Sequence, residues 1–361
     1  MAFEAVRGQA AAVDVLTRAL ASGRVAHAYA FVGPSGVGRK LVAIEFAKAL
    51  LCPHPMPLTS SPLPGGERQG EGVRVRVNAC GRCAACRKVG AGTHPDFMLI
   101  KPTPPESNPR GTVAIRIEAI RQLEQRAALC PAESAWKVFI VDDAGRMTPE
   151  APQAFLKTLE EPPARTVIIL ILAQTRELPA TVLSRCQVVR FVPLGEEEAV
   201  ALLEARGMDG PTARLLARAS QGRPGLALAQ DPKEWVERRE QALSILAEIG
   251  AGRVAAPEGW VGALFKWSET LGRDRALMEQ LIETWWLWYR DLLCAKASGD
   301  PRLLIHGDRA AELTQGAAAR SWEELLQGLA ACREAWQALQ RNVSPRLTLE
   351  VMLSRLALGA A

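Results

Sequence analysis

A short apolar strand, a glycine-rich loop and an apolar helix follow one another near the start of the chain, and this succession restricts the possible folds most. The strand is predicted at residues 28–32 (AYAFV), the loop at 33–38 (GPSGVG) and the helix at 41–51 (LVAIEFAKALL). Backbone amides of such a loop and the helix N-terminus together favour an anion. The segment therefore predicts an α/β fold built around a phosphate-binding type of loop.

Strands and helices continue to alternate along the first half of the chain. Further strands are predicted by apolar runs at residues 96–100, 137–141, 166–173 and 188–192, and helices at 117–127 and 151–161. Residues 166–173 (TVIILILA) are apolar at nearly every position, which is typical of a parallel strand covered on both faces. Together with the strand at residues 28–32, these make five strands that alternate with helices, and they predict a doubly wound parallel sheet with helices on both faces. Its ligands are expected at the carboxyl ends of strands, near residues 33–40, 142–143 and 174–175.

Beyond residue 195 the strand pattern stops and only helical patterns remain. We expect three domains: residues 1–194 form the nucleotide-binding-like α/β domain, residues 195–244 a small helical lid domain, and residues 245–361 an all-helical domain. The first domain carries an inserted cysteine module (52–86) with a Pro-, Gly- and Ser-rich low-complexity loop (53–78). Seven of the nine tryptophans lie in the third domain, at spacings typical of a helical core, with a binding platform as the alternative.

Composition excludes several classes of protein. Apolar residues make up 48% and charged residues 23% of the 361 residues, so the chain can bury a core and is not disordered throughout. The longest strongly apolar run, residues 167–173, is far shorter than the roughly 20 residues that span a bilayer. The N-terminus lacks the pattern of a signal peptide, so we expect a cytoplasmic protein without membrane contact. The net charge of +5 is compatible with nucleic-acid binding but does not require it.

The loop keeps the glycines of a nucleotide-binding loop but not its catalytic side chains. The pattern G-x-x-x-x-G-K-[ST] supplies a lysine to the terminal phosphates and a hydroxyl to magnesium. Gly33, Gly36 and Gly38 are present, whereas Arg39 stands at the lysine position and Lys40 at the hydroxyl position. ATP binding is therefore doubtful. Nucleotide binding without turnover, a weak site in which Arg39 or Lys40 replaces the lysine, and a plain glycine turn all stay open.

Two acids end the strand predicted at residues 137–141 and form a second nucleotide signal. Asp142 stands where an acid orients magnesium, and Asp143 where a glutamate usually activates water. The side chain of Asp143 is one methylene shorter than glutamate, which withdraws the carboxylate from an attacking water. Two solvated acids at a strand end are the alternative, but the glycine loop in the same alternating fold favours a degenerate nucleotide site.

Four of the eight cysteines are clustered and predict a structural zinc site: Cys52, Cys80, Cys83 and Cys86. Two overlapping C-x2-C steps in CGRCAAC suit tetrahedral zinc in a reducing compartment. Residues 53–78 separate Cys52 from the others, so the fourth ligand is the open one, with His54 and His94 in reserve. Redox-active or simply buried thiols are the alternative.

Several motifs, taken in order, resemble bacterial clamp-loader subunits of the AAA+ class. They are VRGQ (6–9), HAYAFVGPSGVGR (27–39), the cysteine cluster, HPD (94–96), VFIVDDA (138–144), LKTLEEPP (156–163) and LSRC (183–186). The resemblance is nearly continuous over residues 6–195 and looser at GRPGLAL (222–228) and NVSPRLTLE (342–350). Within the class, the chain resembles the delta-prime type of the DNA polymerase III complex.

The gamma/tau type, which is the ATP-hydrolysing motor, fits less well. The chain departs from the motor pattern at Arg39, Lys40 and Asp143, and Gly225 stands where the motor carries a phosphate-sensing arginine. The resemblance therefore implies a clamp-loader subunit without turnover of its own, working within a holoenzyme that has nucleotidyltransferase activity. A weakly active ATPase motor of the gamma/tau type remains the alternative.

The resemblance also implies partners and a role for Ser184-Arg185-Cys186, where spacing alone indicates only a surface arginine. It implies that Arg185 is an arginine finger in the ATP site of a neighbouring motor subunit. Cys186 is then a buried spacer, and Ser184 positions the turn. The implied partners are the motor (gamma/tau) and delta subunits, the sliding clamp and primer-template DNA, with residues 245–361 as the collar that joins the subunits.

A third interpretation is a zinc-dependent nucleic-acid-binding module. It rests on the cysteine cluster and its basic flanks, Arg82, Arg87 and Lys88. This interpretation predicts that loss of the metal lowers affinity for DNA, whereas a structural zinc site predicts that it lowers stability.

Overall fold

The computed structural model describes residues 3, 6–54, 78–105, 112–255, 259–341 and 343–358, with the backbone alone at residues 250–255, 259, 260 and 358. Most of the predicted low-complexity loop and Asn342 lie outside these residues. The chain divides into two compact units. Unit 1 comprises Met1–Leu202 with Gly222–Leu226, and unit 2 comprises Leu203–Gln221 with Ala227–Ala361. The finer division into three domains stays a prediction.

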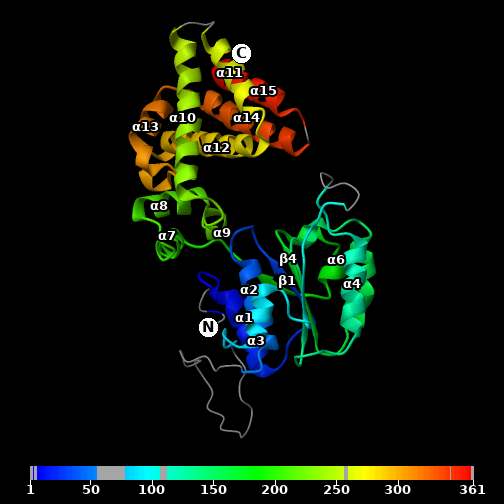
Figure 1. Ribbon diagram of the computed structural model, residues 1–361. Helices are drawn as coiled ribbons and strands as arrows, with labels where there is room; N and C mark the ends of the chain where they lie inside the picture. The colour runs from blue at the N-terminus through cyan, green and yellow to red at the C-terminus, as the bar shows by residue number, and fades with distance from the viewer. Residues whose placement is uncertain are drawn as a thin grey trace. The chain divides into compact units, whose positions relative to one another are not determined.

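Unit 1 is built on a five-stranded parallel sheet with the order β2-β3-β4-β1-β5 (Figure 1). Its strands are β1 (Ala28–Val32), β2 (Phe97–Ile100), β3 (Lys137–Val141), β4 (Thr166–Leu172) and β5 (Gln187–Arg190). Each predicted strand is present and differs from the prediction only at its ends. Every residue of β4 is buried, as expected for a central parallel strand covered on both faces.

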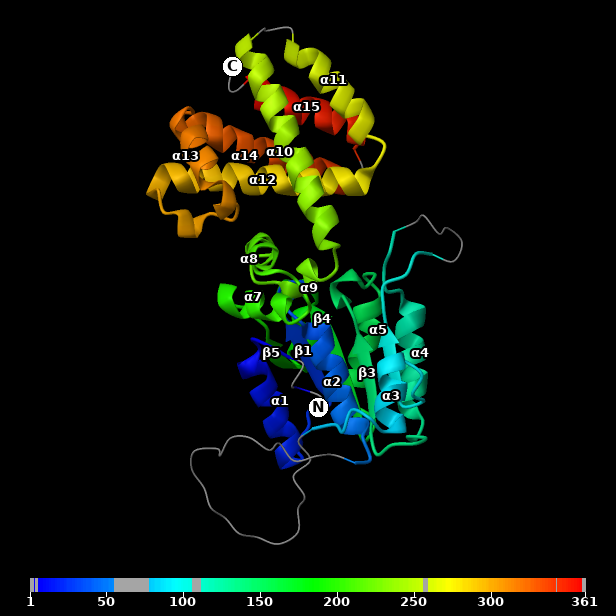
Figure 2. The ribbon, with the colours of Figure 1, turned by 60° about the vertical axis from the view of Figure 1, so that its left-hand side comes forward.

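Helices cover both faces of the sheet (Figure 2). One face is covered by α1 (Ala10–Ser22), α2 (Arg39–Leu51) and α3 (Ala84–Ala91), and the other by α4 (Ile117–Ala128), α5 (Ala151–Glu160) and α6 (Ala180–Leu183). Successive side chains of a strand point to opposite faces, so Tyr29 and Phe31 pack with the first set while Ala28 and Ala30 pack with the second. The predicted α/β fold class is confirmed.

Short elements complete unit 1. They are the 3₁₀ turns η2 (Ala144–Arg146) and η3 (Thr175–Glu177). The chain passes from unit 1 to unit 2 within α7 (Glu196–Glu204), returns to unit 1 after Gln221, and enters unit 2 again within α9 (Pro224–Ala227).

The described secondary structure of unit 2 consists of helices joined by short connections. Its elements are α8 (Gly210–Ala219), α10 (Pro232–Ala255), α11 (Gly259–Leu271), α12 (Arg275–Ser298), η4 (Pro301–Leu303), η5 (Gly307–Arg309), α13 (Ala310–Ala318), α14 (Trp322–Gln340) and α15 (Pro345–Leu358). Trp285 on α12 is fully buried and its indole donates a hydrogen bond to the carbonyl of Ala242, 2.7 Å away. Trp288 is also in the core, whereas Trp286 and Trp322 are exposed, so tryptophans serve both the core and the surface.

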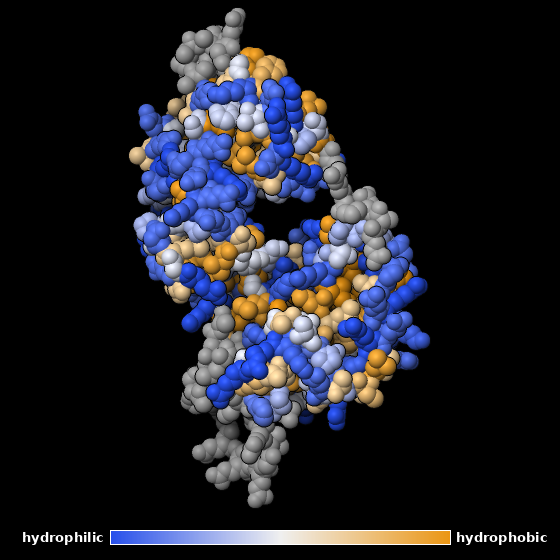
Figure 3. All heavy atoms as spheres, in the orientation of Figure 1, coloured by the Kyte–Doolittle hydropathy of each residue, from blue (hydrophilic) through white to orange (hydrophobic). Residues whose placement is uncertain are grey.

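Hydrophilic residues predominate on the side of unit 2 formed by α10 and α13 (Figure 3). A charged network links α10 to the segment before α13, since Arg239 contacts Asp308 at 2.7 Å and Arg309 contacts Glu240. Among the described residues, no helix is both long and apolar enough to cross a membrane.

Candidate functional site

The three predicted ligand positions lie at the carboxyl ends of neighbouring strands in the sheet of unit 1. The glycine loop follows β1, Asp142 follows β3 and Gln174 follows β4, and these three strands are neighbours in the sheet. Gly33 donates its N–H to the carbonyl of Leu172 at 3.1 Å, and Gly38, with φ of +98°, precedes the first residue of α2. The loop therefore has the backbone course of a nucleotide-binding loop.

The two basic residues after the loop are bound to groups of the protein itself. Arg39 donates to the carbonyl of Leu172 through Nη1 and to Ser35 Oγ, 3.4 Å away, through Nη2. Burial lowers the pKa of Arg39, although Asp143, Glu177 and Asp142 act in the opposite direction. The Lys40 ammonium lies 2.8 Å from Asp142 Oδ2. Neither cation is therefore available in the way that the lysine of an active loop is.

The second acid is also neutralised from within the chain. Asp143 has a left-handed backbone with φ of +54°, and its Oδ2 lies 2.7 Å from Nε of Arg146 in the following turn. This ion pair directs the carboxylate along η2. Asp143 therefore lacks both the length and the free carboxylate expected of a group that activates water.

Residues 222–226 pack directly on the glycine loop. Gly225 donates its N–H to the carbonyl of Gly36 at 2.8 Å, and a Cβ on Gly225 would lie 2.8 Å from that same oxygen. Gly36, with φ of +84°, is itself in close approach to Leu226. Only glycine fits at position 225. The arginine that the motor type carries at this position could not be accommodated without moving the backbone of Gly36.

Gln9 secures the loop from the other side, a role that sequence reasoning missed. Its buried amide donates to the carbonyls of Val192, at 2.7 Å, and Val37, at 3.3 Å, and accepts from the Val192 N–H. The VRGQ motif signalled this residue only as part of a resemblance. Gln9 joins the N-terminal segment, the loop and the end of the sheet.

The four predicted zinc ligands come together in unit 1. Their sulfur atoms lie within 4.8 Å of one another, with Cys52–Cys80 at 3.6 Å, Cys52–Cys83 at 3.8 Å and Cys80–Cys86 at 4.0 Å. A tetrahedral zinc ion with Zn–S bonds of about 2.3 Å requires sulfur atoms roughly 3.8 Å apart. The cluster fits a metal such as zinc, and Cys52 occupies the fourth position.

Backbone amides favour the thiolate form of this cluster. The N–H groups of Cys80, Cys83 and Cys86 point at the sulfurs of Cys52, Cys80 and Cys83, at 3.5, 3.4 and 3.4 Å. Burial raises the pKa of Cys80, but the amides of Arg82 and Cys83 and the neighbouring thiols outweigh it and lower the pKa to about 6. Burial raises the pKa of Cys52 and of Cys86. A cation at the centre would offset the cost of ionising these two.

The two reserve histidines lie outside the cysteine group. His54 is exposed, while buried His94 accepts from the Asp96 N–H through Nδ1 at 3.1 Å and faces Ser134 Oγ through Nε2 at 3.3 Å. Asp96 in turn accepts from the N–H groups of residues 132–134 at 2.7–2.8 Å. The HPD motif thus connects β2 with the segment before β3, and Ser134 Oγ continues the connection to the carbonyl of Leu51.

Arg185 lies at the amino-terminal end of β5, whereas the glycine loop follows the carboxyl end of the neighbouring strand β1. It follows α6 and precedes β5, which runs parallel to β1 with Gln187 paired to Tyr29. Ser184 ends α6 and donates to the carbonyl of Thr181 at 3.1 Å. Cys186 packs against the sheet core, and burial raises its pKa to about 11. Arg185 keeps 36% of its side chain exposed.

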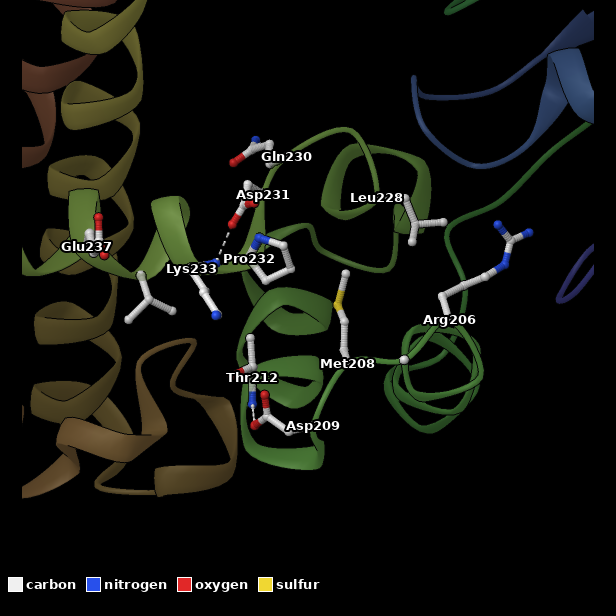
Figure 4. A pocket seen from close by; sticks show the side chains of 12 residues that line it. Arg206, Met208, Asp209, Thr212, Leu228, Gln230, Asp231, Pro232, Lys233 and Glu237 are labelled. Carbon is white, nitrogen blue, oxygen red and sulfur yellow. Dashed lines mark hydrogen bonds between the residues drawn. The ribbon is translucent and has the colours of Figure 1, made fainter.

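Unit 2 carries a separate pocket of about 750 Å³ (Figure 4). Its two labelled aspartates begin helices: Asp209 Oδ2 accepts from the Thr212 N–H at 3.1 Å, and Asp231 Oδ1 accepts from the Lys233 N–H at 2.8 Å. These carboxylates satisfy helix N-termini, so they are not free to act as bases or metal ligands.

The parallel sheet, the glycine loop after β1 and the acids after β3 define a P-loop type of nucleotide-binding fold with a degenerate site. A protein-family profile described as DNA polymerase III, delta subunit, matches residues 8–62 and 68–195. The chain belongs to the delta-prime subunit family of DNA polymerase III. It is therefore a clamp-loader subunit of the delta-prime/gamma group, as the sequence resemblance predicted.

Two bacterial delta' subunits agree with this assignment. The chain is 25% identical to DNA polymerase III subunit delta' of Bacillus subtilis over 96% of this chain and 95% of the relative. It is 31% identical to the delta' subunit of Pseudomonas aeruginosa over 67% of this chain and 69% of that protein. A solved gamma subunit-related protein of Thermotoga maritima covers 96% of this chain and is itself covered to 99%, at 19% identity and a TM-score of 0.42.

Proposed function

We propose that this chain is a clamp-loader subunit that does not hydrolyse ATP. In this role it helps motor subunits of the gamma/tau type to load the sliding clamp onto primed DNA, and it supplies Arg185 to a neighbour's ATP site. The observation that carries the proposal is the 2.8 Å contact between Lys40 Nζ and Asp142 Oδ2. This contact joins the two positions that would share magnesium in an active site.

The other departures from the pattern of an active nucleotide site also argue against ATP hydrolysis. Arg39 is bound to Leu172 and Ser35, Asp143 is bound to Arg146, and Gly225 packs on the loop backbone. Phosphoryl transfer depends on positioned cations and a positioned water. In this chain, the side chains that could supply a cation or position the water are already bound to other groups of the protein.

The position of Arg185 supports action in trans. Gln187 of β5 pairs with Tyr29 of β1, so Arg185, two residues before Gln187, is level with residue 27, just before β1. The glycine loop begins at residue 33, after β1 ends. At about 3.3 Å per residue, these levels are roughly 20 Å apart along the strand. Arg185 therefore does not serve its own loop, and an ATP phosphate that it contacts belongs to another subunit.

The remaining parts of the proposal concern partners and metal. We propose that the subunit works in the cytoplasm with motor and delta subunits, the clamp and primer-template DNA, with contacts to DNA phosphate suiting the net charge of +5. We also propose that Cys52, Cys80, Cys83 and Cys86 hold one structural zinc ion. The helices from residue 245 onward are the proposed collar.

The test is a complex reconstituted from full-length motor, delta and this subunit, compared with the same complex carrying Arg185→Ala. A finger in trans is worth roughly 10³-fold or more in turnover at the site that it completes. The number of ATP molecules hydrolysed per complex in the clamp- and DNA-stimulated burst should therefore fall by one. Arg190→Ala is the matched control, because Arg190 is an exposed arginine on neighbouring β5.

Assembly is checked first by gel filtration. An unchanged burst in the assembled Arg185→Ala complex would contradict the finger. ATP hydrolysis by the isolated, contaminant-free chain would contradict the absence of turnover and favour the weak gamma/tau type of ATPase.

A further inference from the structure

Two contacts from different helices fix the guanidinium of Arg185. Nη1 donates to the carbonyl of Thr181 on α6 at 2.7 Å, and Nη2 donates to Glu160 Oε1, also at 2.7 Å. Glu160 is the last residue of α5, which Pro162 and Pro163 prevent from continuing. The ion pair therefore joins the ends of two elements whose positions are set by the fold.

These contacts leave part of the guanidinium free. An arginine has five N–H donors in a rigid plane, and Thr181 and Glu160 each take one, with Ser184 Oγ in a longer contact at 3.4 Å from Nη1. The donor on Nε and a second donor on Nη2 remain. A planar group held at two points presents its other donors in a defined direction, which suits recognition of phosphate oxygens.

The ion pair is not needed to hold the two helices together. Phe155 and Leu159 of α5 and Val182 of α6 belong to the same buried apolar cluster beneath the sheet. The Glu160 and Arg185 side chains remain 50% and 36% exposed, and exposed pairs contribute little to stability. Removing the Glu160 carboxylate should therefore change the orientation of Arg185 and leave the fold intact.

We propose that Glu160 is a positioning residue that orients Arg185 toward a phosphate held by the neighbouring subunit. This inference rests on the proposed role of Arg185 as a finger in trans. Glu160 contacts neither nucleotide nor magnesium in this arrangement. It acts by restricting the guanidinium to the arrangement seen here before the neighbour's nucleotide arrives, so less freedom is lost when the phosphate is bound.

Glu161 provides a matched control. It is the next residue, carries the same charge and is exposed, yet no ion pair or side-chain hydrogen bond joins it to another described residue. A general effect of negative charge at the end of α5 would appear in both variants. A positioning effect would appear only at Glu160.

The experiment uses reconstituted complexes that contain Glu160→Ala, Glu160→Gln, Glu161→Ala or Arg185→Ala in the full-length chain. The finger-dependent rate is the clamp- and DNA-stimulated ATPase rate of the wild-type complex minus that of the Arg185→Ala complex. We expect Glu160→Ala to lower this rate by roughly tenfold, as loss of a supporting outer partner does at other sites, with an unchanged KM for ATP. Glu160→Gln should retain most of it, because an amide oxygen still accepts from Nη2. Glu161→Ala should equal wild type.

The outcomes separate the inference from the function on which it rests. If Arg185→Ala leaves the rate unchanged, the finger itself is refuted and the positioning role with it. If Arg185→Ala lowers the rate but Glu160→Ala does not, only the positioning role is refuted. Loss of assembly in both Glu160 variants would show a structural role instead and would also overturn the inference.

Discussion

The ammonium nitrogen of Lys40 lies 2.8 Å from Oδ2 of Asp142, so a side chain of the protein binds the carboxylate that would orient magnesium in an active nucleotide site. The two positions come from α2 and from the end of β3. An active site of this type has a hydroxyl at the first position, and the hydroxyl and the acid cooperate in holding the metal. Here Lys40 occupies the carboxylate without a metal, so the proposed absence of turnover depends on a contact that can be tested.

Lys40→Thr should give a larger stabilising response to Mg·ATP than the wild-type chain. The substitution frees Asp142 and introduces a hydroxyl, while Asp143 stays paired with Arg146, so we expect binding without turnover. Ligand at ten times its Kd would stabilise the variant by about 1.4 kcal/mol. Thermal unfolding with and without Mg·ATP measures this. Lys48→Thr is the control, because Lys48 pairs with Glu45 within α2. An equal response in wild type and Lys40→Thr would rule out the contact as the cause.

Gly225→Ala should destabilise unit 1. The added methyl group would lie 2.8 Å from the carbonyl oxygen and 3.0 Å from Cα of Gly36, and backbone cannot move aside as a flexible side chain can. We expect a loss of roughly 1–3 kcal/mol in the free energy of unfolding, measured by urea denaturation. At Gly195 an added Cβ meets nothing within 4 Å, so Gly195→Ala should stay within about 0.5 kcal/mol of wild type. Equal effects at both positions would argue against the close packing of Gly225.

The sheet could be predicted from sequence because its strands are local and strongly patterned. The run from Thr166 to Leu172 is apolar throughout and is buried throughout, and the glycine loop marks where β1 ends. The local sequence pattern also identified Arg39, Lys40 and Asp143 as departures from the pattern of an active nucleotide site. Local pattern was sufficient for these features because each depends on residue type and spacing alone.

The contacts that explain the site could not be predicted in this way. The partners Lys40 and Asp142, Gly36 and Gly225, and Glu160 and Arg185 are distant in sequence and meet only in the folded unit. Cys52 shows the same limit. The sequence left it open against two histidines, and the structure places its sulfur 3.6 Å from Cys80 while His94 is committed to Ser134. A local pattern gives candidate ligands, and tertiary structure decides among them.

Asp96→Asn should destabilise the chain at neutral pH and have less effect in acid. Burial raises the pKa of Asp96, but three backbone N–H groups and His94 outweigh it, so the folded pKa is below the ordinary value. A depressed pKa contributes stability that is complete above the unfolded pKa of about 4 and is lost as the pH falls through the folded value. We expect a loss of about 2 kcal/mol at pH 7, because bonds to a charged acceptor are replaced by those of an amide.

Urea unfolding of wild type and Asp96→Asn between pH 7 and pH 3 measures this difference, and pH effects common to both proteins cancel. The difference should narrow below about pH 4. Asp14→Asn is the control, since Asp14 is exposed and, among the residues that the structure describes, forms an ion pair only with Arg18 on the same helix. A difference that stayed constant down to pH 3 would show that the Asp96 carboxylate charge is not what the three amides stabilise.

Cys83→Ser should remove zinc and lower stability without changing affinity for DNA. The four sulfurs already have the spacing of a tetrahedral site, and a structural zinc ion contributes of order 10 kcal/mol to the folding of the segment that holds it. We expect about one zinc per chain in wild type and little in the variant, measured by atomic absorption, with a lower unfolding temperature. Cys130→Ser is the matched control, because Cys130 is an exposed cysteine outside the cluster. A variant that kept its stability but bound DNA more weakly would instead favour the nucleic-acid-binding module flanked by Arg82, Arg87 and Lys88.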